Sequence, residues 1–262
     1  MTEPKIFEAG TAGATPINRQ RVEHWFFSGL ALLILVEVFV GFAHTYFLAG
    51  LFRAPLRNTL LHVHGAVFTL WILLYVTQTS LVAARRVDIH RRLGVFGMVV
   101  ACLLVVLGVL IATQSLVDDG KPGPEGFGKR NFYAVQLADI LMFATLIWFA
   151  FRKRGRPAMH KRLALIATLS ILDAAYDRWP VPVPWWDDRV TPLICTYPLL
   201  VLLMAYDWWT TRKVQPVTLW ATVFLIVVQQ GRDPFGHTGI WQDFAAWVYL
   251  HSQSWPIFRG TM

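Results

Sequence analysis

The sequence predicts an all-α polytopic membrane protein, with about seven transmembrane helices around a four-helix core. Composition is the first observation behind this fold class: apolar residues make up 55% of the 262 residues and charged residues only 15%, unlike a soluble domain. The second observation is that the apolar residues gather in runs of roughly 20. A helix of that length crosses the hydrocarbon layer, where no water can satisfy bare backbone groups.

Seven apolar runs are candidates for membrane-spanning helices. The first is too long for the core of a signal peptide and lacks a small-residue cleavage site, so we interpret it as a retained anchor. The fifth and seventh are short, and each is a candidate for a tilted, half-buried or re-entrant helix. The runs cover residues 25–50, 59–84, 93–115, 131–151, 163–177, 190–208 and 217–230.

The chain divides into three parts. Residues 1–18 are polar and lack an apolar period, which predicts a flexible cytoplasmic tail. Residues 19–230 form the predicted transmembrane helical domain, and residues 231–262 form a Trp-rich interfacial segment. Within that segment, residues 240–258 space their aromatic side chains as an amphipathic interfacial helix does. The Pro- and Trp-rich stretch 178–189 is also expected at the membrane interface.

Lysine and arginine are unevenly distributed between the predicted loops. With seven spans and a cytoplasmic N-terminus, 15 of the 24 Lys and Arg residues fall on the cytoplasmic side. The positive-inside rule therefore predicts a protein of the cytoplasmic (inner) membrane with its N-terminus inside and its C-terminus outside. This topology accounts for the formal charge of +8, so no nucleic-acid partner is needed to explain it.

A short internal repeat supports the four-helix core. The segment HRRLGVFG begins at His90, before the third run, and HKRLALIA begins at His160, before the fifth run. Each histidine follows a basic turn and opens the next helix. The pattern predicts two hairpins in the same sense, formed by the second to fifth helices, and such hairpins pack as a four-helix bundle.

Polar residues in the outer half of the bundle form a first candidate site. His62 and His64 lie two positions apart and therefore on nearly opposite sides of a helix, and only His64 shares its face with bulky aromatic residues. Asp139 lies at a comparable depth on the diagonal helix, so it can face one cavity with His64. The metal-ligand candidates are His64, Asp139 and His62. The alternative is that both histidines are hydrogen-bonded or hydrated at headgroup depth.

Further acids lie in the apolar runs, and two of them are Glu37 and Asp173. Glu37 falls near the middle of the first predicted helix, where we expect it to be protonated or hydrogen-bonded to a neighbouring helix. Asp173, at the outer end of the fifth run, is either an interfacial charge or part of the outer cavity.

His90 and His160 form a second candidate site. They stand at equivalent inner ends of the third and fifth helices, on the other diagonal of the core. Two neutral imidazoles on facing helices are the ligand set of a low-spin haem b, and the adjacent cations Arg91 and Lys161 suit its propionates. These four residues are the cofactor-binding candidates. The alternative is that each histidine simply begins a helix among positive-inside residues.

Three motifs, HxHG at residues 62–65, HRRLG at 90–94 and HKRL at 160–163, resemble those of a group of bacterial polytopic membrane proteins without an assigned function. The layout is more distantly similar to that of the ascorbate-reducible transmembrane b cytochromes, which carry two haems on the two diagonals of a four-helix core. That resemblance implies an inner haem on His90 and His160. It also assigns His64 to the outer pair, where Asp139 replaces the second histidine.

Three functional hypotheses follow. The first is a b-type-cytochrome-like electron carrier with haem near the cytoplasmic side. The second is a haem-free membrane protein whose polar intramembrane pocket takes a metal, an ion or a proton-coupled solute. The third is a structural or assembly subunit. The expected partners are the lipid bilayer and either a membrane redox partner or a second copy of the chain. No catalytic residue, and hence no enzymatic reaction, can be assigned from the sequence.

Overall fold

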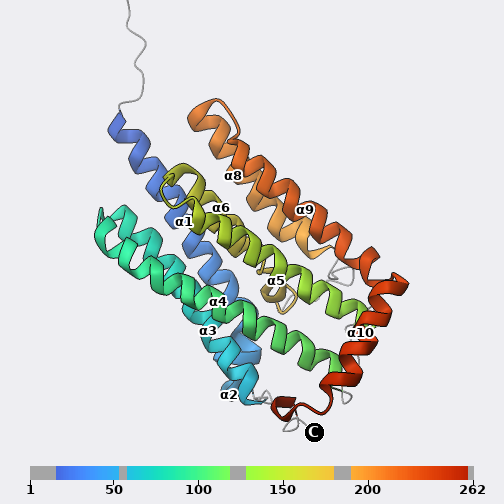
Figure 1. The fold of residues 1–262 in the computed structure, drawn as a ribbon. Helices are drawn as coiled ribbons and strands as arrows, with labels where there is room; N and C mark the ends of the chain where they lie inside the picture. The colour runs from blue at the N-terminus through green and yellow to red at the C-terminus, as the bar shows by residue number, and fades with distance from the viewer. Residues whose placement is uncertain (1–15, 53–57, 119–127, 180–189, 259–262) are drawn as a thin grey trace, which may run out of the picture.

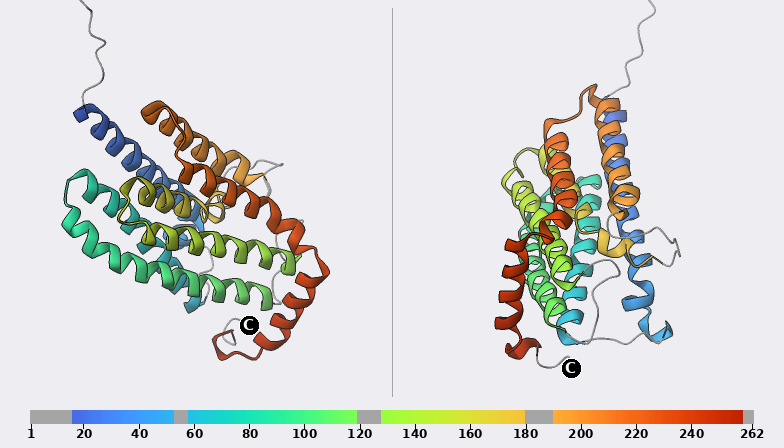
Figure 2. Two further views of the ribbon diagram at one scale, coloured as in Figure 1. Left: turned by 45° about the horizontal axis from the view of Figure 1, so that its top comes forward. Right: turned by 90° about the vertical axis from the view of Figure 1, so that its right-hand side faces the viewer.

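The computed structural model describes residues 16–52, 58–118, 128–179 and 190–258. Over these ranges the chain is almost entirely helical, and no strand occurs in them, which confirms the all-α prediction. Figures 1 and 2 show the long helices running side by side as one bundle. In chain order the elements are α1 (Pro16–Phe42), η1 (Ala43–Phe47), α2 (Ala49–Phe52), α3 (Thr59–Ala83), α4 (Val87–Val117), α5 (Lys129–Arg152), α6 (Pro157–Leu169), α7 (Asp173–Tyr176), η2 (Pro192–Thr196), α8 (Tyr197–Thr211), α9 (Pro216–Gly236), α10 (Gly239–Ser252) and η3 (Pro256–Phe258).

Local sequence signals explain several helix starts. The side chain of Asn58 accepts a hydrogen bond of 3.0 Å from the backbone N–H of Leu61 and so caps α3. Proline begins α6 and α9, at a position where its missing N–H costs no helical hydrogen bond. Thr238 caps α10 through the backbone N–H of Trp241. Capping side chains and prolines therefore mark where these helices begin.

In the described part of the chain, five helical segments are long and apolar enough to cross a membrane. They are Gln20–Phe47, Thr59–Ala83, Val87–Val117, Lys129–Arg152 and Pro192–Thr211, and they match the first, second, third, fourth and sixth predicted runs. This agrees with a membrane-embedded protein. The seven spans of the prediction are not all established by this criterion.

The fifth and seventh predicted runs behave differently from the other five. Helix α6 has 13 residues, a length of about 20 Å, and it ends at Leu169, after which the chain turns into the short α7. The single run 163–177 is therefore two helices. Helix α9 has 21 residues and continues to Gly236, six residues beyond the predicted end at 230. Its last turns carry Gln229, Gln230, Arg232 and Asp233, which lower its mean hydropathy.

Neighbouring helices pack in a simple order. Helix α3 packs on α4, α4 on α5, and α5 on both α6 and α9, while α1 covers α3. Side chains also meet across both diagonals of the α3–α6 set: Trp71 of α3 contacts Phe143 of α5 with ring centroids 5.2 Å apart, and α4 meets α6 through two histidines. These contacts agree with a core of α3 to α6. The duplication of a hairpin stays a prediction.

The basic turns gather at one end of the bundle. Figure 1 shows the α3–α4, α5–α6 and α8–α9 turns at the end where α1 begins, and we call this the basic end. Arg85, Arg86, Arg154, Arg156 and Lys213 lie there on the surface. The distribution of charge predicted from the sequence is thus present in three dimensions, whichever compartment the basic end faces.

Helix α10 lies across the ends of α4 and α5 at the opposite end (Figures 1 and 2). Trp241 anchors it: its indole N–H donates a 2.7 Å hydrogen bond to the backbone carbonyl of Arg130, and its ring packs on Tyr133. The predicted helix at 240–258 is confirmed up to Ser252, whereas its position at a lipid interface stays a prediction. At the other terminus α1 begins at Pro16, inside the predicted tail. The stretch 180–189 lies outside the described residues.

Close backbone contact between α1 and α7 requires Gly41. A Cβ atom at this position would fall on the backbone carbonyl of Ala175. We expect Gly41→Ala to destabilise the protein by about 1–3 kcal/mol, because backbone atoms of two helices must move apart. Thermal unfolding in detergent measures this, with Gly29→Ala as the control, since a Cβ at Gly29 meets nothing within 4 Å. Equal melting temperatures for the two variants would contradict the contact.

Candidate functional site

His90 and His160 meet between α4 and α6, close to the basic end. Their ring centroids are 6.1 Å apart and the ring planes make an angle of 77°. Each histidine stands in the first turns of its helix, His90 after the α3–α4 turn and His160 after the α5–α6 turn. The two imidazole rings therefore lie close to each other, at the shared depth that the repeat HRRL/HKRL predicted.

The two imidazole rings lie beside backbone groups of the neighbouring helices. The Nδ1 atom of His160 forms a 2.9 Å hydrogen bond with the backbone carbonyl of Ala150 on α5. The ring of His90 lies beside the backbone of Gln78 on α3, and its Nδ1 atom is buried without a hydrogen-bond partner among the described residues. A backbone bond on one ring nitrogen fixes which nitrogen remains for a ligand. Each imidazole thus keeps one nitrogen available.

The two predicted propionate partners differ in their surroundings. Arg91 is exposed at the start of α4. Lys161 is ion-paired with Glu23 of α1, and its ammonium group lies 4.7 Å from the ring centroid of Phe27. Lys161 is therefore held toward α1, and Arg91 is the more accessible of the two cations. No spacing pattern predicts that Lys161 and Glu23 pair, because they lie on α6 and α1.

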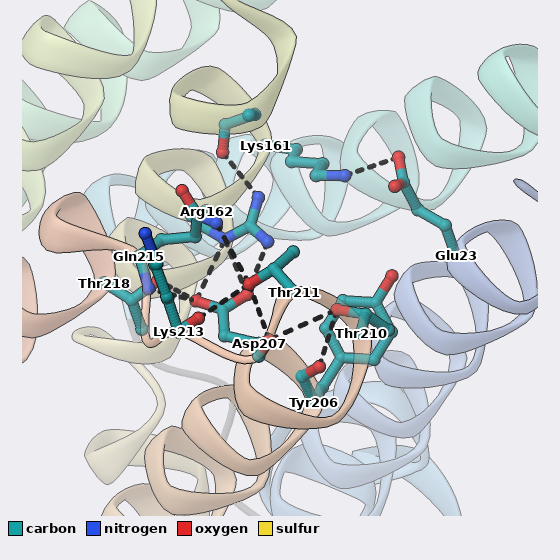
Figure 3. A network of polar contacts seen from close by, with 11 residues as sticks. Glu23, Lys161, Arg162, Tyr206, Asp207, Thr210, Thr211, Lys213, Gln215 and Thr218 are labelled. Atoms are coloured by element: carbon teal, nitrogen blue, oxygen red, sulfur yellow. Dashed lines mark hydrogen bonds and ion pairs between the residues drawn. The ribbon is translucent and has the colours of Figure 1, made fainter. Parts of the chain in front are cut away.

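Arg162, two residues after His160 on α6, forms a buried ion pair with Asp207 (Figure 3). The guanidinium of Arg162 donates two hydrogen bonds from Nε to the carboxylate of Asp207 on α8, at 3.0 and 3.2 Å, and a further one from Nη2. The exposed fractions of the two side chains are 4% and 0%. Asp207 also accepts from the hydroxyl of Thr218 at 2.7 Å and from the backbone N–H of Gln215 at 3.2 Å. One carboxylate therefore ties α6, α8 and α9 together.

The outer candidate residues lie in different surroundings. His62 faces η1, where the Tyr46 hydroxyl donates to the His62 backbone carbonyl at 3.1 Å and the two rings are 5.8 Å apart. His64 lies near Phe68, with ring centroids 6.4 Å apart, and its Nδ1 has no hydrogen-bond partner among the described residues. Asp139 is ion-paired with Arg232 of α9. Pairing of Asp139 with His64 stays a prediction.

Arg232 joins two carboxylates from different elements. Its Nη1 donates to Asp139 of α5, and its Nη2 donates to Asp173 of α7 at 3.1 Å. Asp173 is buried and accepts two more hydrogen bonds, from Gln229 at 2.9 Å and from Thr196 at 3.0 Å. Three charged side chains thus connect α5, α7 and α9 in the half of the bundle away from the basic end. Asp173 belongs to this network, and its place in an outer cavity stays a prediction.

Arg232 lies outside the predicted seventh helix, which ends at residue 230. A helix that continues to Gly236 places Arg232 one turn after the buried Gln229 and aims both at Asp173. Arg232 could have been found from the sequence, because an intramembrane charge needs a partner. Asp139 and Asp173 are acids of other helices at a similar depth, and each requires a cation or a hydrogen-bond donor. The same reasoning could have paired Arg162 with Asp207.

Glu37 is hydrogen-bonded to another element, as expected for an acid within an apolar run. The hydroxyl of Tyr176 in α7 donates to its carboxyl group at 2.7 Å, which confirms the expected link to another element. The indole N–H of Trp179 donates to the Glu37 backbone carbonyl at 3.3 Å. Helix α7 is therefore attached to α1 on one side and to α9 on the other.

Among the described residues, no three or more His, Cys, Asp or Glu side chains gather in an arrangement that could hold a metal ion. No protein-family model, curated protein or solved structure matches the chain. The resemblances to the HxHG-containing membrane proteins and to the b cytochromes stay predictions, and the site must be interpreted from its own geometry.

Removing Arg232 tests whether the ion pairs are structural. We expect Arg232→Gln to cost about 3–5 kcal/mol of unfolding free energy, because two carboxylates lose their cation in a poorly solvated site. Unfolding in detergent measures the loss. Glu23→Gln is the control: it breaks the partly exposed pair with Lys161, worth about 1 kcal/mol or less. Adding Asp173→Asn to Arg232→Gln should recover stability, and no recovery would contradict a charge-based role.

Proposed function

We propose that the protein is an integral membrane electron carrier that holds one haem b between His90 and His160, near its basic end. The observation that carries the proposal is the 6.1 Å separation of the two ring centroids. Metal–nitrogen bonds of roughly 2.0–2.1 Å on opposite sides of one ion place two imidazole centroids roughly 6 Å apart. At this separation, His90 and His160 would hold one haem iron between them.

The donor set suits haem better than a bare ion. A structural zinc site takes four protein ligands, whereas a haem iron takes two from the protein because the porphyrin supplies the other four nitrogens. Two imidazoles with one available nitrogen each are a complete axial set. When bound, a haem supplies one-electron chemistry.

The chain's own residues have three tasks in this proposal. The carbonyl of Ala150 and the backbone of Gln78 orient the two imidazoles, which fixes the ligand axis. Leu163 and other apolar side chains beside His160 exclude water. Arg91, exposed at the basic end, is available to a propionate or to an anionic partner surface. The partner would be a redox protein of the same membrane or a second copy of the chain.

A second candidate function rests on the other half of the bundle. The carboxylates of Asp139 and Asp173 both pair with Arg232, and the Oε1 atom of the buried Gln229 has no hydrogen-bond partner among the described residues. A buried polar network of this kind suits an ion or a proton-coupled solute, as intramembrane charges often do. Haem-free protein from haem-replete cells, with solute uptake lost in Asp173→Asn, would favour this candidate over the first.

The absorption spectrum of the purified protein tests the haem. We expect about one haem per chain, with a Soret band that shifts on reduction by dithionite and is lost in His90→Ala and in His160→Ala, because each variant removes one axial ligand. His251→Ala is the control, since this exposed histidine lies on α10 at the opposite end. Colourless wild-type protein from haem-replete cells would refute the proposal.

We also propose seven passes of the membrane, with the basic end in the cytoplasm. The support is that the α3–α4, α5–α6 and α8–α9 turns share one end with the start of α1. In intact spheroplasts, an N-terminal tag should resist protease and a C-terminal tag should be removed. The reverse pattern would contradict the orientation, and equal treatment of both tags would contradict an odd number of passes. Lysed spheroplasts, in which both tags are cleaved, are the control.

A further inference from the structure

The Arg162–Asp207 pair has a special position relative to His160. Arg162 follows His160 by two residues on α6, so its side chain leaves the opposite face of the helix. His160 faces α4, and Arg162 faces α8 and α9. The pair therefore carries a full positive and a full negative charge close to the proposed ligand without touching it. Both side chains are almost completely removed from solvent.

We propose that Arg162 and Asp207 set the redox potential of the haem held by His160, as a balanced pair of buried charges. The proposal rests on the proposed function, because it needs a redox group at His160. Reduction adds one electron to ferric iron, supplied in the experiment by an electrode through mediators, and no protein bond forms or breaks. A nearby positive charge stabilises the added electron and raises the potential, and a nearby negative charge lowers it.

Burial is what makes these charges effective. Charges separated by water are screened, whereas charges in a poorly solvated interior act over longer distances. The four hydrogen-bond donors on Asp207 come from Arg162, Thr218 and the Gln215 backbone. Donors of this kind stabilise the ionised carboxylate. In the intact pair the two fields nearly cancel at the iron, so either charge alone would move the potential.

The arrangement also explains why the neighbouring pair does not have this role. Lys161 and Glu23 lie beside the same turn of α6, but the exposed fractions of their side chains are 22% and 41%. Solvent and salt screen such a pair. Arg162→Gln and Asp207→Asn therefore remove deeply buried charges, and Glu23→Gln removes a partly exposed charge of the same sign as Asp207. This gives a matched control in one protein.

The test is a redox titration of the full chain in detergent, followed by the Soret band. Asp207→Asn should raise the midpoint potential, because Arg162 is left uncompensated, and Arg162→Gln should lower it. The double variant Arg162→Gln/Asp207→Asn should return close to the wild-type potential, since the charges are removed together. Glu23→Gln should shift the potential by less than either buried variant. Arg162→Lys and Asp207→Glu, which keep the charges, should resemble the wild type.

Opposite shifts of the two single variants, with recovery in the double variant, are the result that a merely structural pair would not give. Shifts of the same sign, or no shift in haem-loaded variants, overturn the proposal. Loss of haem in the charge-removing variants and in both charge-preserving ones also overturns it, because the pair is then needed only for folding. Wild-type protein without haem refutes the proposed function itself, which separates the two failures.

Discussion

The basic half of the bundle depends on the ion pair and the hydrogen bonds that the carboxylate of Asp207 forms. It is fully buried and accepts hydrogen bonds from α6, from the α8–α9 turn and from α9. A carboxylate in a poorly solvated site is tolerated only when donors surround it, so these three elements have to meet at this point. Because His160 lies on the same turn of α6, the meeting point also fixes where that imidazole stands. The geometry of the histidine pair is thus a consequence of where one charge is buried.

In the opposite half of the bundle, buried carboxylates are likewise surrounded by donors, and the cation there is Arg232. Helix α6 is too short to cross the membrane alone, and its continuation α7 consists of a single turn. Such a segment has little stability of its own. Asp173 binds Arg232 on α9, and Tyr176 binds Glu37 on α1. Gly41 lets the backbone of α1 approach the backbone of α7 closely. Broken helices at membrane depth occur where protein satisfies the freed backbone groups, and here polar side chains hold the broken segment in place.

Much of the fold could be predicted from the sequence, because apolar runs of membrane length leave few alternatives. Five of the seven predicted runs became helices of spanning length. The failures concern polar residues: the run 163–177 was one apolar segment by composition but breaks after Leu169, and α9 continues through Arg232 and Asp233, which look like a loop in isolation. In both places a charged residue, Asp173 or Arg232, pairs with a residue on another element, and a hydropathy pattern contains no information about such partners.

In the candidate site, too, local patterns could be predicted from the sequence and long-range partners could not. The repeat around His90 and His160 is a local pattern at equivalent positions of two helices, so their juxtaposition was predictable. The partners of Lys161, Arg162 and Asp139 come from α1, α8 and α9, and no spacing rule connects them. Counting charges would have helped, because each acid buried in an apolar run requires a cation or a donor at the same depth. Depth is therefore the useful coordinate for pairing residues in such a sequence.

Helix α6 links the two polar regions physically. His160 and Asp173 lie thirteen positions apart in the chain, on α6 and on the segment that follows its end at Leu169, and buried charged side chains hold both ends. A segment held at both ends by directional bonds has little freedom to slide or rotate, because a shift of one residue would break bonds at both ends. Asp207 therefore fixes the depth of Asp173 as well as the place of His160. The same constraint that buries charge at the basic end positions the acid that Arg232 binds at the other.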